Sequence, residues 1–332
     1  MSPIRRGSLA AAATLGIAAC GMPVFHPGSG PAGRVARLGL FMVVVSAVIL
    51  VVVLAILALA TRRHRDRPPD AVDLTPRGHG WIIYGGALMP TIVLSTVFVV
   101  SLWALGRFPA RAARELTVEV VAHQWWWEVA YTTDSVSDRI TTADEIHIPV
   151  GQPVRLLLTS RDVIHSFWVP ELQGKLDLIP GDTNDLRLAA DRPGAYTGVC
   201  AEYCGLQHAH MAFRIVADPP ADFARWLAAQ RAPATEPVEP LAIEGKELFV
   251  SGPCAMCHTV SGTGAEGKVA PDLTHVGSRR TLAAGTLVNS LGNMEAWITN
   301  AQSLKPGAKM PSMTQFTGRQ LRAVATYLEG LH

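Results

Sequence analysis

The chain has 332 residues, of which 49% are hydrophobic, and its mean hydropathy of +0.23 is high for a fully water-soluble protein. Its formal net charge is only +2, and no basic stripe interleaved with aromatic residues occurs, which excludes a nucleic-acid-binding protein. Residues 115–216 contain seven basic and fourteen acidic side chains. This imbalance predicts an acidic surface, which either favours a basic partner or serves only solubility.

The first 19 residues have the layout of an export signal. Arg5 and Arg6 precede an apolar stretch, Leu9–Ala19, and Cys20 follows directly. The ending resembles a bacterial lipoprotein signal, in which the cysteine is lipidated and becomes the new N-terminus. The alternative is an ordinary cleavage site with an incidental cysteine. We expect a lipoprotein-type signal over residues 1–19 and lipidation of Cys20.

Two long stretches without a charged side chain follow, Leu38–Ala60 and Trp81–Leu105. Each is long enough to cross the hydrocarbon core of a bilayer. The connector between them is rich in arginine: Arg62, Arg63, Arg65, Arg67 and Arg77. The positive-inside rule places such a connector in the cytoplasm, so the N-terminus and everything after Arg107 would lie outside. We predict a two-helix transmembrane hairpin within residues 20–107.

The hydrophobic period changes to two at Leu116. Short β-rich runs cover residues 116–121, 145–150, 154–159, 186–189 and 211–216, and Gly, Pro and Asp turns separate them. This pattern predicts an all-β Greek-key sandwich or barrel over residues 115–217. Residues 218–242 predict a short helix and a Pro/Ala/Glu linker. The pattern is then helical through residues 243–332.

The strongest motif combines sulfur and imidazole side chains. Cys200, Cys204, His208 and Met211 lie on one predicted loop between strands, and His165 lies 35 residues upstream of Cys200. Thiolate, imidazole and thioether ligands suit copper, and two thiolates indicate either zinc or two bridged copper ions. A Cys200–Cys204 disulfide and a structural zinc site are the alternatives, but neither accounts for Met211 or His165.

Residues 115–217, with the two preceding spans, resemble subunit II of cytochrome c oxidase, and the loop matches that family's Cys-x-Glu-x-Cys-Gly-x-x-His-x-x-Met signature at every position. The resemblance implies a cupredoxin-like sandwich in which Cys200 and Cys204 bridge two copper ions. It also implies that the coordination is completed by His165, His208, Met211 and the backbone carbonyl of Glu202. The Glu202 side chain would point away, toward a magnesium ion shared with the catalytic subunit.

Three consecutive tryptophans in Ala122–Glu128 form a second motif of that family. The resemblance implies that the first, Trp125, lies over the copper site and forms the electron-input surface. Core packing is the alternative for one or two of these rings on the predicted strand.

Cys254, Cys257 and His258 form the attachment motif of a c-type haem, in which two thioethers hold the porphyrin and the histidine binds the iron. Pro271 follows at the distance where cytochromes c place a proline whose carbonyl orients that histidine. Met310 is the candidate distal iron ligand, and Met294 and Met313 compete for that role. A thioredoxin-like dithiol is the alternative, but it would need a βαβ context. Residues 243–332 therefore resemble a small, all-α class I cytochrome c.

These resemblances imply the electron-input subunit of a respiratory cytochrome c oxidase. Electrons would pass from the fused haem c to the binuclear copper centre and on to subunit I, the haem–copper subunit that reduces dioxygen to water and pumps protons. Expected partners are subunits I and III and an upstream reductase or small cytochrome c. The expected location is the bacterial inner membrane, with both redox domains on the periplasmic side.

Two other functions compete with this hypothesis: the copper-site subunit of a nitric oxide reductase, and a copper-trafficking lipoprotein. A storage protein would have no use for a fused haem. The chain also departs from the oxidase family at the start of its second span. The family usually carries an acidic residue of a proton channel there, whereas Arg77–Pro90 contains neither Asp nor Glu. The resemblance therefore does not extend to proton uptake at this point.

Overall fold

The computed structural model describes residues 23–64, 79–105, 115–132 and 139–332. Internal contacts divide the chain into two compact units, one containing the N-terminal helices and one made of residues 26–29 and 109–332. The predicted signal peptide, Cys20, Arg107 and most of the arginine-rich connector lie outside the described residues.

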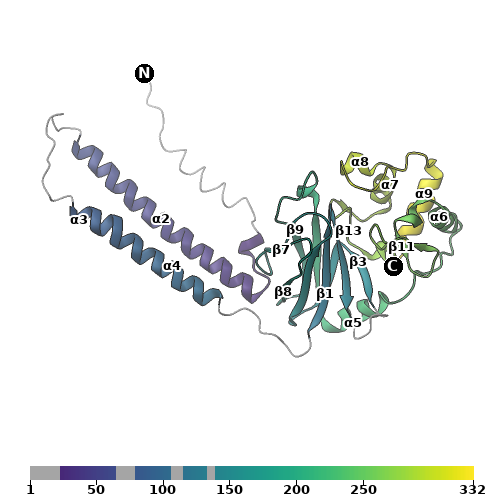
Figure 1. Cartoon of the computed structure of the whole chain (residues 1–332), viewed down its shortest axis with the longest axis horizontal. Helices are drawn as coiled ribbons and strands as arrows, with labels where there is room; N and C mark the ends of the chain where they lie inside the picture. The colour runs from purple at the N-terminus through teal and green to yellow at the C-terminus, as the bar shows by residue number, and fades with distance from the viewer. Residues whose placement is uncertain (1–22, 65–78, 106–114, 133–138) are drawn as a thin grey trace, which may run out of the picture. The chain divides into compact units, whose positions relative to one another are not determined.

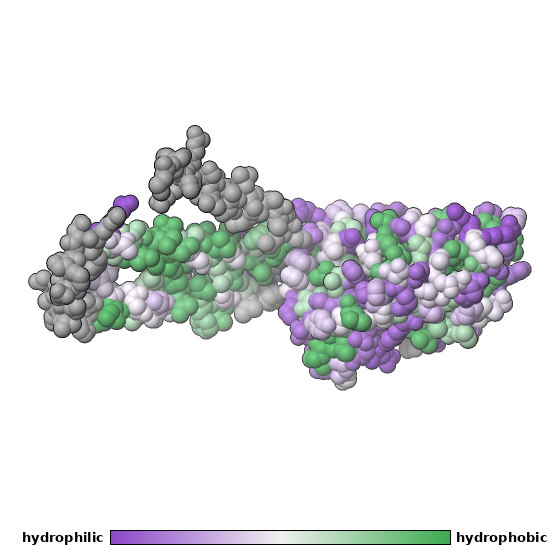
Figure 2. All heavy atoms as spheres, turned by 90° about the horizontal axis from the view of Figure 1, so that it is seen from above, coloured by the Kyte–Doolittle hydropathy of each residue, from purple (hydrophilic) through white to green (hydrophobic). Residues whose placement is uncertain are grey.

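The N-terminal unit contains the two apolar helices that the sequence predicts. A short turn of helix, η1 (Pro23–Phe25), precedes α2 (Gly30–His64), and the second helix runs through α3 (His79–Trp81), a π-helical segment η3 (Ile82–Leu88) and α4 (Met89–Leu105). Both helices are long and apolar enough to cross a membrane. Figure 2 shows that hydrophobic residues cover their surface, as a lipid environment requires.

The β-rich segment forms two five-stranded sheets that share one hydrophobic core, which confirms the predicted sandwich (Figure 1). One sheet has the order β3-β2-β1-β5-β8 and the other β4-β10-β9-β6-β7. The strands are β1 (Leu116–His123), β2 (Trp126–Thr132), β3 (Ile140–Ala143), β4 (Glu145–Pro149), β5 (Val154–Ser160), β6 (His165–Trp168), β7 (Leu176–Leu178), β8 (Asn184–Leu188), β9 (Gly194–Cys200) and β10 (Ala212–Asp218). Along β5 buried and half-buried residues alternate, because successive side chains point to opposite faces of the sheet.

Helices dominate the chain after the sandwich. They are α5 (Pro220–Ala229), α6 (Pro240–Ser251), α7 (Leu291–Thr299), α8 (Ala301–Leu304) and α9 (Gly318–Glu329). Between them lie the short turns η6 (Pro253–Met256) and η7 (Val276–Ser278) and the ribbons β11 (Thr259–Val260) with β12 (Ala265–Glu266) and β13 (Thr281–Leu282) with β14 (Leu287–Val288). Helices α6 and α9 cross closely at Gly245, where a Cβ atom would lie 2.0 Å from the Ala323 carbonyl oxygen. The helical cytochrome-like domain is thus confirmed, with two small ribbons added in its loops.

The pairing of β9 with β10 gives a test of core packing. Gly198 lies opposite Phe213, and a Cβ atom there would lie 2.1 Å from the ring. The ring is fully buried and stacks on Phe167 at a centroid distance of 4.4 Å, so it has little room to move. We expect Gly198→Ala to lower the free energy of unfolding by about 1–3 kcal/mol through overpacking. Thermal unfolding of the full chain measures this. Gly174→Ala, whose Cβ meets no atom within 4 Å, is the control, and equal midpoints for the two variants would contradict the packing argument.

Candidate functional site

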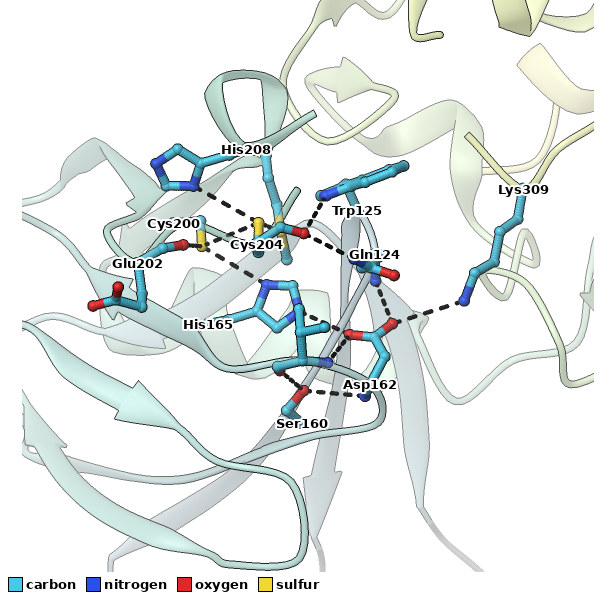
Figure 3. Close-up of polar contacts among 12 residues, drawn as sticks. Gln124, Trp125, Ser160, Asp162, His165, Cys200, Glu202, Cys204, His208 and Lys309 are labelled. Carbon is cyan, nitrogen blue, oxygen red and sulfur yellow. Dashed lines mark hydrogen bonds and ion pairs between the residues drawn. The ribbon is translucent and has the colours of Figure 1, made fainter. Parts of the chain in front are cut away.

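The sandwich brings the six predicted copper ligands together at one end (Figure 3). His165 is the first residue of β6, Cys200 is the last residue of β9, and Met211 directly precedes β10. Cys204 and His208 lie on the loop between β9 and β10, whose antiparallel pairing brings the two ends of the loop back together. Four of these side chains are fully or almost fully buried: His165, Cys200, Cys204 and Met211.

The donor atoms lie within a few ångström of one another. The Cys200 and Cys204 sulfurs are 3.7 Å apart, and the Nδ1 atoms of His165 and His208 lie 3.7 Å from Cys200 and Cys204, respectively. The Met211 sulfur is 3.8 Å from the Cys204 sulfur, and the Glu202 carbonyl oxygen is 3.2 Å from the Cys200 sulfur. The Glu202 carboxylate points away from the sulfurs and lies 3.7 Å from the Lys175 ammonium (Figure 3).

The close contact of the two sulfurs perturbs both thiols. The hydrogen bond from Cys204, together with that from His165, holds the pKa of Cys200 well below its usual range despite burial. The neighbouring Cys200 thiolate and burial raise the pKa of Cys204. Burial alone would lower the pKa of His165, but its hydrogen bonds to Cys200 and Asp162 outweigh burial and raise it. A cation would therefore find one thiolate already formed and would release the proton of the other.

Asp162 orients His165, and the sequence analysis missed it. Its carboxylate lies 2.9 Å from His165 Nε2 and accepts hydrogen bonds from the backbone amides of Gln124 at 2.7 Å and Val163 at 2.8 Å. Burial would raise the pKa of Asp162, but these hydrogen bonds lower it overall. The only signal in the sequence was a carboxylate three residues before a candidate ligand, which is too common a pattern to be informative.

Trp125 lies against the copper-ligand loop, but it is not on a strand. It occupies the turn between β1 and β2, and only Trp126 and Trp127 belong to β2. The indole Nε1 donates to the Cys204 carbonyl at 3.0 Å, and the Gln124 side chain donates to the same oxygen at 2.8 Å. Trp125 is 9% exposed, whereas Trp127 is a fully buried core residue, as the packing alternative predicted for some of these rings.

The haem-attachment residues line one cavity of about 290 Å³. Cys254, Cys257 and His258 border it, and His258 Nδ1 lies 2.8 Å from the Pro271 carbonyl, which leaves Nε2 available to a metal. Burial lowers the pKa of His258 and so favours the neutral imidazole that binds iron. Residue 267 must be glycine, because a Cβ atom there would lie 2.5 Å from the backbone of Cys257 in the attachment motif.

The cavity suits a flat apolar group with acidic ends, which is the chemistry of haem. Its walls include the buried side chains of Phe249, Ile298, Val324 and Leu328. Arg279 also lines it, and its buried Nε has no hydrogen-bond partner among the described residues, so a propionate could accept from it. All three candidate methionines border the cavity. Met294 and Met313 belong to the buried core, whereas Met310 lies half-buried in the loop after α8.

The copper domain supplies part of the wall of the same cavity. Gln124, Trp125, Trp126 and Asp144 border it together with the attachment residues. Trp125 therefore contacts both candidate sites, since its ring borders the haem cavity and its Nε1 binds the copper-ligand loop.

Comparisons with known proteins agree with both sites. Residues 134–218 match the family "Cytochrome C oxidase subunit II, periplasmic domain", and residues 242–332 match the family "Cytochrome c". Cytochrome c oxidase subunit 2 of Alkalihalophilus pseudofirmus is 34% identical over 296 residues, which cover 87% of this chain and 84% of that protein. The same subunit of Bacillus subtilis is 31% identical over 254 residues, covering 74% and 70%.

A solved structure, the periplasmic domain of subunit II of cytochrome oxidase of Bradyrhizobium japonicum, is 28% identical with a TM-score of 0.34 and covers 37% of this chain and 97% of that one. The Alkalihalophilus relative extends across helices, sandwich and haem domain alike, so the likeness is not confined to one module. The chain therefore belongs to the cytochrome c oxidase subunit 2 family, in a form with a C-terminal cytochrome c domain.

Proposed function

We propose that this chain is the electron-input subunit of a bacterial cytochrome c oxidase and relays electrons from a covalently bound haem c to a binuclear copper centre. The observation that carries the proposal is the position of Trp125, which borders the haem cavity and donates to the backbone of the copper-ligand loop. Membership of the family makes the chain a subunit of a haem–copper oxidase and a copper and haem protein.

The donor set fits two copper ions. It offers two thiolates, two imidazoles, a thioether and a carbonyl oxygen, whereas a tetrahedral zinc site uses four donors and a blue copper site has a single thiolate. Two metal ions that share both sulfurs would use all six donors. Because protein donors would fill the coordination sphere, the centre would exchange single electrons without binding a substrate. Dioxygen would then be reduced in subunit I.

The haem domain would hold its cofactor in the manner of class I cytochromes. Cys254 and Cys257 would form the thioethers, His258 and Met310 would bind the iron, and the Pro271 carbonyl would orient His258 through Nδ1. A bound haem c supplies single-electron exchange at a potential that the Met/His pair raises. The apolar walls of the cavity would exclude water from it.

Partners and location follow from the same assignment. Tyr203 on the copper-ligand loop is exposed, and so are Ile164, next to His165, and Ile179, which follows Leu178 opposite His165; subunit I would cover these apolar side chains. The Glu202 carboxylate on this face would reach the shared magnesium ion. The upstream donor would be a reductase or a small cytochrome c, and subunit III would complete the assembly. The two helices would span the inner membrane with both redox domains on the periplasmic side.

The first prediction tests the bridging thiolates. Cys200→Ser removes one of two sulfurs that lie 3.7 Å apart, so two copper ions can no longer share their electron evenly. We expect the mixed-valence copper signal in electron paramagnetic resonance to disappear. The haem absorption spectrum should stay unchanged, since Cys200 does not border the haem cavity. A surviving two-copper signal would show that the assignment is wrong.

The second prediction tests the orientation of His165. Asp162→Asn replaces one carboxylate oxygen by an amide NH2 group, which cannot accept a hydrogen bond. That group would face at least one of the three nitrogens that now contact the carboxylate, those of the Gln124 and Val163 amides and His165 Nε2. We expect copper affinity, measured by competition with a chelator, to fall about 10–100-fold. Asp185→Asn is the matched control, because Asp185 forms its ion pairs with Arg155 and Arg187, away from the site. Equal affinities in the two variants would remove Asp162 from the site.

The third prediction identifies the distal iron ligand. Met310→Leu keeps the size of the side chain but removes the sulfur, so the reduced haem should bind carbon monoxide and its potential should fall. Met294→Leu and Met313→Leu provide the comparison, and both should retain the wild-type spectrum. Carbon monoxide binding in either of these and not in Met310→Leu would transfer the ligand role to that residue.

A further inference from the structure

Two loops of the haem domain rest on the copper domain next to its ligand loop. The Ala284 carbonyl accepts from the Ala212 amide at 3.0 Å, and the Pro306 carbonyl accepts from the Gln207 side chain at 2.7 Å. Farther along the junction, the Arg280 amide donates to the Glu145 carboxylate at 3.0 Å. The two domains are therefore joined by directional hydrogen bonds as well as by the linker.

Lys305 lies at the centre of this junction. Its side chain is 2% exposed, and its ammonium donates to the Trp125 carbonyl at 2.8 Å and to the Ala283 carbonyl at 3.1 Å. One side chain thus ties both loops of the haem domain to the residue that contacts the two redox sites. Burial lowers the pKa of Lys305 to about 8, and the nearby Asp144 carboxylate opposes this shift. Lysine is rarely buried so completely unless it is paired, which points to a specific role.

Three residues with a strained backbone also lie at this junction. Among the described residues, the non-glycine residues with a left-handed backbone are Asp144, Ala283 and Ala284, with φ values of 61°, 52° and 56°. All three border the haem cavity at this junction. Such conformations cost free energy and persist only where the surroundings enforce them. Here they aim the Ala283 carbonyl at Lys305 and the Ala284 carbonyl at the Ala212 amide.

The linker is also bound rather than free. The Ala234 amide donates to the Ser261 carbonyl at 2.9 Å, and His275 Nε2 lies 3.1 Å from the Ala232 carbonyl. A haem domain on a loose tether would reach the copper domain by repeated collisions, at a rate set by linker length. The contacts of linker and junction instead favour a fixed arrangement.

We propose that Lys305 is a positioning residue that locks the haem domain onto the copper domain at Trp125, so that electrons cross a pre-assembled junction. The inference rests on the proposed relay and adds the residue that sets its geometry. It also assigns Trp125 to the chain's own haem, since Lys305 and Gly307 help to cover it and an external cytochrome would find little of the ring exposed.

The test uses the full chain, loaded with haem and copper, in detergent. Lys305→Met keeps the length of the side chain but removes the donor of the Trp125 carbonyl and one of the two donors of the Ala283 carbonyl, which keeps its hydrogen bond from Thr286. Two readouts are taken: hydrogen exchange at the Ala212 and Arg280 amides, which are bonded across the junction, and the rate of haem-to-copper electron transfer. Lys246→Met is the matched control, because this lysine lies in α6 of the haem domain and pairs with Glu236 of the linker.

We expect Lys305→Met to raise exchange at these two amides about tenfold to a hundredfold, since the buried junction loses two hydrogen bonds from one ammonium and the Trp125 carbonyl loses its donor. Amides of the central strand β1 should stay protected, electron transfer should slow, and Lys246→Met should behave as wild type. If Lys305→Met does not retain both cofactors, Gln207→Leu removes another side-chain donor of the junction, and the same two readouts are taken.

Two results would overturn the inference: exchange as slow in Lys305→Met as in wild type, or fast exchange at both amides already in wild type. A third outcome separates the two proposals. If exchange is slow in wild type but no electron passes from haem to copper, the locked junction is supported and the proposed relay is rejected.

Discussion

Two hydrogen bonds to the Cys204 carbonyl link the candidate copper site to the wall of the candidate haem site. Trp125 and Gln124 both donate to the Cys204 carbonyl, so the turn between β1 and β2 is fixed to the loop that carries the copper ligands. The same turn forms part of the wall of the haem cavity. If this turn moved, the copper-ligand loop would lose two hydrogen bonds, and Trp125 would no longer lie between that loop and the haem cavity. The proposed relay therefore depends on this local backbone contact as well as on the two binding motifs.

The junction between the domains uses buried charge where a hydrophobic contact would have been more stable. Lys305 and Asp144 are buried there and Arg279 is half-buried with a buried Nε, and each loses hydration that its partners only partly replace. Buried polar contacts impose one geometry, because a shifted arrangement would leave charges without partners. For electron transfer a single arrangement matters more than a few kcal/mol of affinity. The strained backbone of Ala283 and Ala284 likewise fixes one geometry, because it directs their carbonyls at Lys305 and at the Ala212 amide.

Local patterns predicted the fold class, a family resemblance implied the ligand sets, and long-range contacts explain what both missed. The residues from Cys200 to Met211 form one contiguous motif and the haem motif is five residues long, so each could be matched to its family directly in the sequence. The apolar stretches and the period-two runs likewise depend only on neighbours in the chain. Asp162, Arg279 and Lys305 had no such signal, since their roles arise from partners brought close by folding. Trp125 was placed on a strand because alternation cannot reveal a turn that a distant carbonyl stabilises.

A single-electron kinetic experiment tests most directly whether one chain carries an electron from its haem to its copper pair, as proposed. A photochemical donor reduces the haem of the oxidised wild-type chain by one electron, and the haem and copper absorbances are followed together over a range of protein concentrations. We expect the haem to be reoxidised and the copper pair to be reduced with one common first-order rate that does not change with protein concentration. A haem that stays reduced, or a rate that rises in proportion to concentration, would contradict the proposal.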